Sequence, residues 1–196
     1  MNLQRFCVKF FAQSGYDIND EHFINIFHQW IRHQKLGGIL LDVADYRHVP
    51  EGPGIMLITH EINFAMDYNH GRLGLLAQRK LGAGETLSER IVGLVQATAK
   101  FGALLEQESR LGGYFKLEGG SFHFQSNDRL LAPNTAEAFT VLQPDLAAAT
   151  ALIYPGRDIT LTQVSNDPRD RLTVAVQSGE AVDLKSLLEV TTQVFE

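Results

Sequence analysis

Apolar residues recur along the chain with two different periods, and each period predicts a different element. Residues 3–12 form a short run rich in aromatic and β-branched side chains, which is typical of a strand. After a turn at residues 15–19, apolar residues recur every three or four positions up to about Gln34, which predicts an amphipathic helix. Residues 39–44 are a second strand candidate, and turn-forming residues fill positions 45–54.

The pattern over residues 55–80 predicts a long β-hairpin. Its strands, 55–68 and 72–80, are joined by Asn69-His70-Gly71, where Asn and Gly favour the positive φ of a tight turn. Glycines at 82–84 end this region. Thr86 and Glu89 then match the T-x-x-E capping box, which predicts the start of a long helix that closes at Gly112-Gly113.

The second half repeats the order strand, helix, hairpin, helix. A strand-like segment at 114–126 precedes a helix whose capping pair we expect at Asn134 and Glu137. Pro144 predicts a kink or a break in that helix, because proline lacks an amide proton and clashes with the preceding turn. Strands follow at 159–164 and 171–177, and Asp183 caps a last helix.

These elements predict an α+β fold with a predominantly antiparallel sheet and helices packed on one face. We expect one domain, 1–196, because no linker of disordered composition divides it, with possible pseudo-repeated halves at 1–112 and 113–196. The second sheet face must be solvated, closed over a pocket, or covered by a second subunit.

Composition narrows the function classes. Hydrophobic residues make up 44% and charged residues 20% of the 196 residues, which is enough for an ordinary core. The net charge of −6 argues against generic nucleic-acid binding, which depends on phosphate neutralisation. No stretch approaches the roughly 20 apolar residues of a membrane helix, and residues 1–11 lack the features of a signal peptide, so we expect a cytoplasmic protein.

Motifs for metal, cofactor or nucleophile chemistry are missing from the sequence. It has no H-x-x-x-H, H-E-x-x-H or C-x-x-C spacing, no G-x-S-x-G and no phosphate-loop motif. We therefore expect neither a metal nor a cofactor. The lone Cys7 lies between apolar neighbours, which predicts a buried and unreactive thiol.

Three groups of polar residues are candidate sites. On the predicted hairpin, Glu61, Asn63 and Asp67 share one face with Arg72 opposite, which predicts either a ligand site or a solvated face with charge pairs. In the stiff 45–54 loop, Tyr46, Arg47 and His48 form either a ligand site or an ordered turn.

The third group is Asp128 and Arg129, between a strand and a helix. They either form a local ion pair or hold an anion, and the structural role is favoured.

Three function hypotheses follow. The leading one is a non-catalytic module that binds or senses a small molecule on the open sheet face. The second is an enzyme whose acid–base groups come from the following set: Asp45, Tyr46, His48, His60, Glu61 and Asp67. The third is a homodimeric interaction protein that buries the exposed sheet face against a second copy.

Three short segments carry a resemblance to other proteins. HVPEGPG (residues 48–54), GRLGL (71–75) and NDRLLAPNT (127–135) resemble segments of an uncharacterised group of bacterial proteins. The resemblance covers about the middle half of the chain. It implies no fold, activity or functional residue.

Overall fold

The computed structural model describes residues 1–13, 18–80 and 84–192, with the backbone alone for 190–192. The strands are β1 (Phe6–Phe11), β2 (Leu40–Asp45), β3 (Ile55–Thr59), β4 (Ile62–Asp67), β5 (Gly74–Arg79), β6 (Ser121–Ser126), β7 (Ile159–Gln163) and β8 (Thr173–Ser178). The helices are α1 (Glu21–Arg32), α2 (Leu87–Glu106), α3 (Ala136–Ile153) and α4 (Leu184–Thr192). Two 3₁₀ turns, η1 (Asn69–Gly71) and η2 (Ser109–Leu111), complete the described elements.

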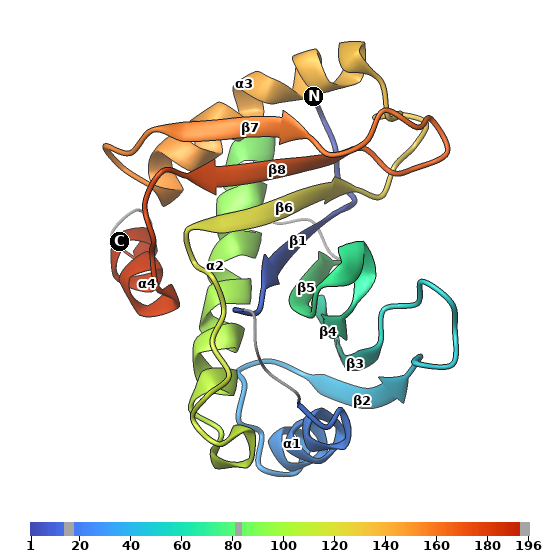
Figure 1. The fold of residues 1–196 in the computed structure, drawn as a ribbon, viewed down its shortest axis with the longest axis vertical. Coiled ribbons are helices and arrows are strands. Elements are labelled where there is room, and N and C mark those ends of the chain that lie inside the picture. Colours follow the sequence, from blue (N-terminus) through green and yellow to red (C-terminus); the bar gives the residue numbers. More distant parts are fainter. Residues whose placement is uncertain (14–17, 81–83, 193–196) are drawn as a thin grey trace.

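All eight strands form one open sheet in the order β2-β3-β4-β5-β1-β6-β8-β7, and every neighbouring pair is antiparallel. The helices pack against this sheet, with α2 crossing behind the central strands, α1 beside β2 and α3 beside β7 (Figure 1). This arrangement confirms the predicted α+β fold with an antiparallel sheet.

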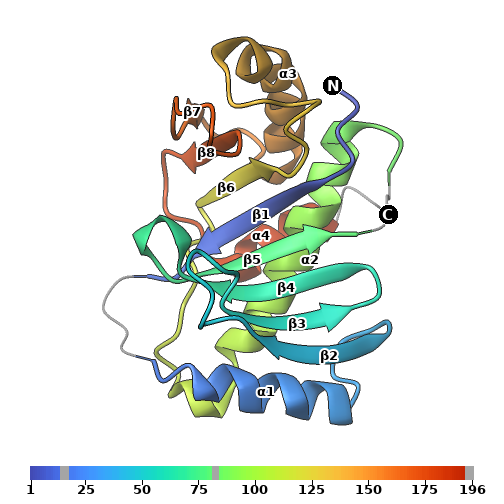
Figure 2. The ribbon, with the colours of Figure 1, turned by 90° about the vertical axis from the view of Figure 1, so that its right-hand side faces the viewer.

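The two halves of the chain meet in the middle of the sheet. The first strand of each half, β1 and β6, pair with each other, and each also pairs with the last strand of its own half, β5 or β8 (Figure 2). The second half runs from a central strand through a helix and a hairpin to a second helix, whereas in the first half four consecutive antiparallel strands, β2 to β5, stand in place of the hairpin. A common origin of the halves stays a prediction.

The core lies between the sheet and the helices. Alternate residues of β1 (Phe6, Val8, Phe10) are fully buried on this side. The ring of Phe6 stacks on that of Phe124 in β6, with 5.1 Å between centroids. The intervening residues Cys7 and Lys9 must face the opposite side, because side chains alternate along a strand. We call that second side the open side of the sheet.

The start of α2 confirms the capping box. The hydroxyl of Thr86 accepts a hydrogen bond from the Glu89 amide at 3.2 Å, and the Glu89 carboxylate accepts one from the Thr86 amide at 3.2 Å. Two amides that lack partners within the helix are thereby satisfied.

The start of α3 differs from the prediction. Thr135, not Asn134, is the N-cap, since its hydroxyl accepts a hydrogen bond from the Ala138 amide at 3.2 Å. Asn134 instead donates to the carbonyls of Ser165 and Asp167 at 3.0 and 2.8 Å and so fixes the connection between β7 and β8. The helix continues through Pro144, so the expected break does not split it.

The predicted strand 55–68 is in fact two strands, β3 and β4, with a tight turn at His60 and Glu61. The Thr59 hydroxyl closes this turn by donating to the Ile62 carbonyl at 2.6 Å and accepting from the Ile62 amide at 3.1 Å. Leu57 therefore lies opposite Phe64, and both side chains enter the core. The turn also reverses which residues share a side, so the alternation of β3 does not continue into β4 as it would in one strand.

Two predicted turns, at residues 15–19 and 82–84, fall mainly outside the described residues. In the described part of the chain, no helix is long and apolar enough to span a bilayer.

Candidate functional site

A pocket of about 470 Å³ opens between the two helices that cover the first half of the sheet. Helix α1 packs on β2 and β3, whereas α2 packs on β1 and β5, so the end of β4 lies between them. The α1–β2 connection borders this gap. The following residues line what we call the helix-side pocket: Lys35, Leu36, Gly37, Gly38, Ile39, Leu40, Thr59, Glu61, Ile62, Phe64, Ala97, Lys100, Phe101 and Leu104.

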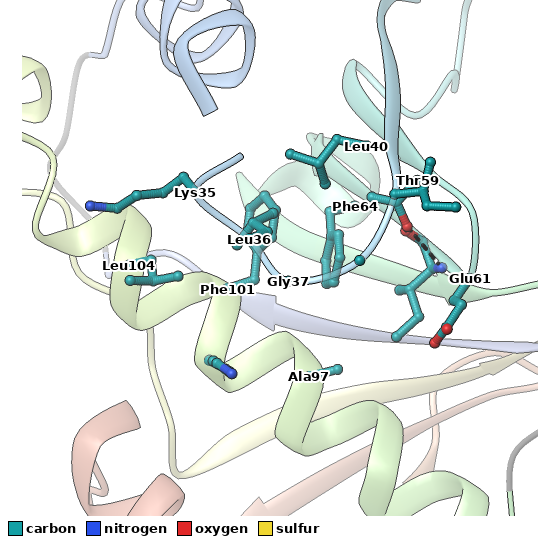
Figure 3. Close-up of a pocket in the computed structure, with 14 residues that line it drawn as sticks. Lys35, Leu36, Gly37, Leu40, Thr59, Glu61, Phe64, Ala97, Phe101 and Leu104 are labelled. Carbon is teal, nitrogen blue, oxygen red and sulfur yellow. Dashed lines mark hydrogen bonds between the residues drawn. The ribbon is translucent and has the colours of Figure 1, made fainter. Parts of the chain in front are cut away.

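Two aromatic rings form the centre of the helix-side pocket. Phe64 of β4 and Phe101 of α2 stack with centroids 4.1 Å apart and an interplanar angle of 17° (Figure 3). Trp30, the single tryptophan of the chain, makes an edge contact with Phe101, and their ring centroids are 5.0 Å apart. Trp30 is held in place because its indole N–H donates to the Glu108 carboxylate at 2.6 Å. A ligand against Phe101 would therefore lie one ring away from the indole.

Helix α2 supplies one wall through residues that recur at helical spacing. Lys100 and Phe101 each lie three or four positions from both Ala97 and Leu104, so the four residues share one side of the helix. Most of the lining is aliphatic or aromatic, and the hydroxyl of Thr59 is already used within its own turn.

The charged groups of the helix-side pocket lie at its rim. Lys35 and Glu61 stand at opposite ends (Figure 3), and Lys100 of α2 is exposed. Neither lysine forms an ion pair with any residue that the structure describes. The pocket can therefore take an apolar group along its floor and an anionic group at its rim.

Asp67, one of the predicted site residues, lies on the open side in a buried ion pair. Its carboxylate is 3.0 Å from the ammonium of Lys9, and both residues are 2% exposed. Lys9 also donates to the carbonyls of Asn69 and Arg72 at 2.6 and 3.1 Å. Burial lowers the pKa of Lys9 below its usual range, although Asp67 acts in the opposite direction. This pair holds the β4–β5 connection against the sheet.

Neither Arg72 nor Asn63 forms a hydrogen bond or ion pair with Asp67 in the described structure. The Arg72 guanidinium donates to the Ala12 carbonyl at 2.6 Å and to Glu118 at 2.7 Å. Asn63 lies further along β4, and its buried Oδ1 has no hydrogen-bond partner in the described residues. Glu61, at the opposite end of β4, is about 20 Å from Asp67 along the strand.

His70 and His123, which the sequence did not indicate as candidate site residues, contact each other on the open side. The rings of His70 and His123 form an edge contact with centroids 5.2 Å apart. The ring of Phe11 forms another edge contact with His123, with 4.6 Å between centroids. Burial lowers the pKa of His123 to about 4, with a further contribution from His70, so its imidazole is neutral near pH 7. The buried Nδ1 of His123 has no partner among the described residues.

The 45–54 loop forms a shallow cavity rather than a reactive cluster. Arg47 binds the Asp45 carboxylate at two points, at 2.9 and 2.6 Å, which lowers the pKa of Asp45 to about 2. Tyr46 and Arg47 line a cavity of about 660 Å³ together with Tyr68. His48 is exposed and is not part of that lining.

The residues of the predicted acid–base set are divided between the two ends of strand β3. Asp45, Tyr46 and His48 precede the five-residue strand β3, whereas His60 and Glu61 follow it. That strand separates them by about 17 Å. Glu61 lines the helix-side pocket and Tyr46 lines the cavity of about 660 Å³, so neither of these pockets is lined by both groups, and no group of three potential metal ligands occurs in the described residues.

Cys7 confirms the prediction of a buried thiol. It is 1% exposed, and its sulfur accepts a hydrogen bond from the Asn127 side chain at 3.1 Å. Burial raises the pKa of Cys7 to about 11. A thiol in this setting is not a nucleophile at neutral pH.

Comparison with known proteins adds no relative to this picture. No family model matches the chain, and no curated protein or solved structure matches it either.

Proposed function

We propose that this protein is a non-catalytic binding protein for a small amphipathic carboxylate. The observation that carries the proposal is the mostly apolar pocket of about 470 Å³ whose rim carries two lysines without ion-pair partners in the described chain. Pockets of this size with few polar groups are typical of small-molecule sites. The site lies on the helix side of the sheet, whereas the sequence had suggested the open side.

The two parts of the ligand have different tasks. Apolar surface of the lining, including the partly exposed Leu36, Ile39 and Leu104, supplies most of the affinity, at about 0.8 kcal/mol for each buried CH₂ group. Lys35 and Lys100 are exposed, so each adds less than about 1 kcal/mol and mainly orients the carboxylate. We therefore expect affinity to rise about fourfold for each added CH₂ until the pocket is full.

The acid–base enzyme receives less support, and the homodimeric interaction protein stays a prediction. The acid–base enzyme depended on residues that β3 separates, so its proposed centre is not assembled in the described residues. The net charge of −6 still argues against a nucleic-acid partner, and a cytoplasmic location remains part of the proposal.

Fluorescence of Trp30 provides the direct test. Titration with octanoate, decanoate and dodecanoate below their micelle concentrations should change the Trp30 emission, with affinity rising with chain length. Ala97→Phe, which fills the pocket, should abolish the change, and Lys100→Met should weaken decanoate but not decanol. Lys185→Met, at an exposed position of α4 outside the pocket, is the matched control and should bind as the wild type does.

Two results would overturn the proposal. One is that none of the three carboxylates binds the folded wild-type protein at millimolar concentration. The other is that Ala97→Phe, with an unchanged melting temperature, still binds decanoate with wild-type affinity.

A further inference from the structure

A third pocket, of about 520 Å³, lies on the open side between the β4–β5 connection and the β7–β8 connection. Its lining is mainly polar and includes three arginines, Arg129, Arg169 and Arg171. We call it the arginine pocket. It shares no lining residue with the helix-side pocket.

The three arginines differ in how far their charges are compensated. Arg169 is bound at two points by Asp167, at 3.0 and 2.6 Å. Arg171 donates only to a neutral group in the described structure, the Asn127 side-chain oxygen at 2.8 Å. Two donor nitrogens of Arg171 are therefore left for a ligand.

Arg129 is also left without a carboxylate. Its neighbour Asp128 instead accepts hydrogen bonds from the amides of Leu130 and Leu131 at 3.2 and 3.0 Å. No ion pair between Asp128 and Arg129 forms in the described residues. Of the two roles that the sequence left open for this pair, the geometry favours the anion site.

The floor of the arginine pocket is polar and buried. Gln125 and Thr173 are 7% and 4% exposed, and the Gln125 amide donates to the Thr173 hydroxyl at 3.3 Å. Asp170, the acidic group of the β7–β8 connection in this lining, accepts from the Ser165 hydroxyl at 2.6 Å. His70 forms part of the wall, and burial lowers its pKa below the usual range.

We propose that the arginine pocket binds a small phosphomonoester that also carries hydroxyl groups. Arg171 and Arg129 would hold the phosphoryl oxygens, because the planar guanidinium matches the oxygens of phosphate in bidentate hydrogen bonds. Gln125 and Thr173 would meet the hydroxyl groups at the floor. This site is independent of the carboxylate binding proposed above, because it lies on the other side of the sheet.

Calorimetric titration at constant ionic strength tests the site. Inorganic phosphate and glycerol 3-phosphate should both bind the wild type, with glycerol 3-phosphate tighter because it also reaches the floor. Arg129→Gln and Arg171→Gln should each weaken both probes by at least about tenfold. Arg157→Gln should have no effect, because Arg157 pairs with Glu180 outside the pocket. Arg129 is exposed, so its replacement should not affect folding.

Three outcomes would overturn the proposal. The first is no binding of either probe to the wild type. The second is wild-type affinity in both Arg129→Gln and Arg171→Gln. The third is binding to vesicles that contain phosphatidic acid without binding to either soluble probe, which would assign the arginines to a membrane surface instead.

Discussion

At the scale of single residues, the buried ion pair of Lys9 and Asp67 stabilises the open side of the sheet. Lys9→Met should lower the free energy of unfolding by about 3 kcal/mol, because it leaves a buried carboxylate without its partner. The carbonyls of Asn69 and Arg72 also lose a donor. Urea unfolding at pH 7 measures this loss.

The matched control removes the charge from both members of the pair. The double variant Lys9→Met, Asp67→Asn should recover most of the lost stability, because no charge is then left buried. A loss below about 1 kcal/mol in Lys9→Met alone would mean that Asp67 finds other partners or water, and that the pair does not fix the connection.

Sequence reasoning found one member of this pair and missed the other. Asp67 stood out because it shares a predicted strand face with Glu61 and Asn63. Lys9 was the available signal, since a lysine in the middle of an apolar strand must find an acidic partner. The partner's identity depended on how β1 and β4 are placed in the sheet, and no local pattern contains that information.

At the scale of elements, the capping box of α2 makes a measurable contribution. Thr86→Ala should reduce the free energy of unfolding by about 1 kcal/mol, because the Glu89 amide loses its acceptor. Thr86→Ser keeps the hydroxyl and should retain most of the stability. Equal losses in the two variants, measured by urea unfolding, would show that the methyl group and not the hydrogen bond matters.

Most elements were predictable because their signals are local. The strand β1, the helices α1 and α2, and the pair β7 and β8 follow from apolar periodicity and capping residues. The turn at His60 and Glu61 was missed because it contains none of the usual turn residues. Its signal was Thr59, whose side chain takes over the turn hydrogen bonds.

At the scale of the whole molecule, both proposed sites depend on contacts between distant segments. The helix-side pocket draws on residues between Lys35 and Leu104, and the arginine pocket on residues between Glu51 and Thr173. The sheet order places these segments together, and a strand order cannot be read from local patterns. The sequence therefore identified Glu61 and Arg129 as candidate site residues, but it could not identify the residues that lie beside them in the two pockets.

The position of Cys7 has a consequence for the whole molecule. Its thiol lies in a central strand, so a disulfide reagent such as 5,5′-dithiobis(2-nitrobenzoate) can reach it only when β1 separates from its neighbours. We expect the folded protein to react at least about a thousandfold slower than the urea-unfolded chain at pH 8, and the rate to rise with urea as the unfolding equilibrium does. Fast labelling of the folded protein would show that β1 opens locally. The reaction rate of the single thiol therefore measures how often the central strands of the sheet separate.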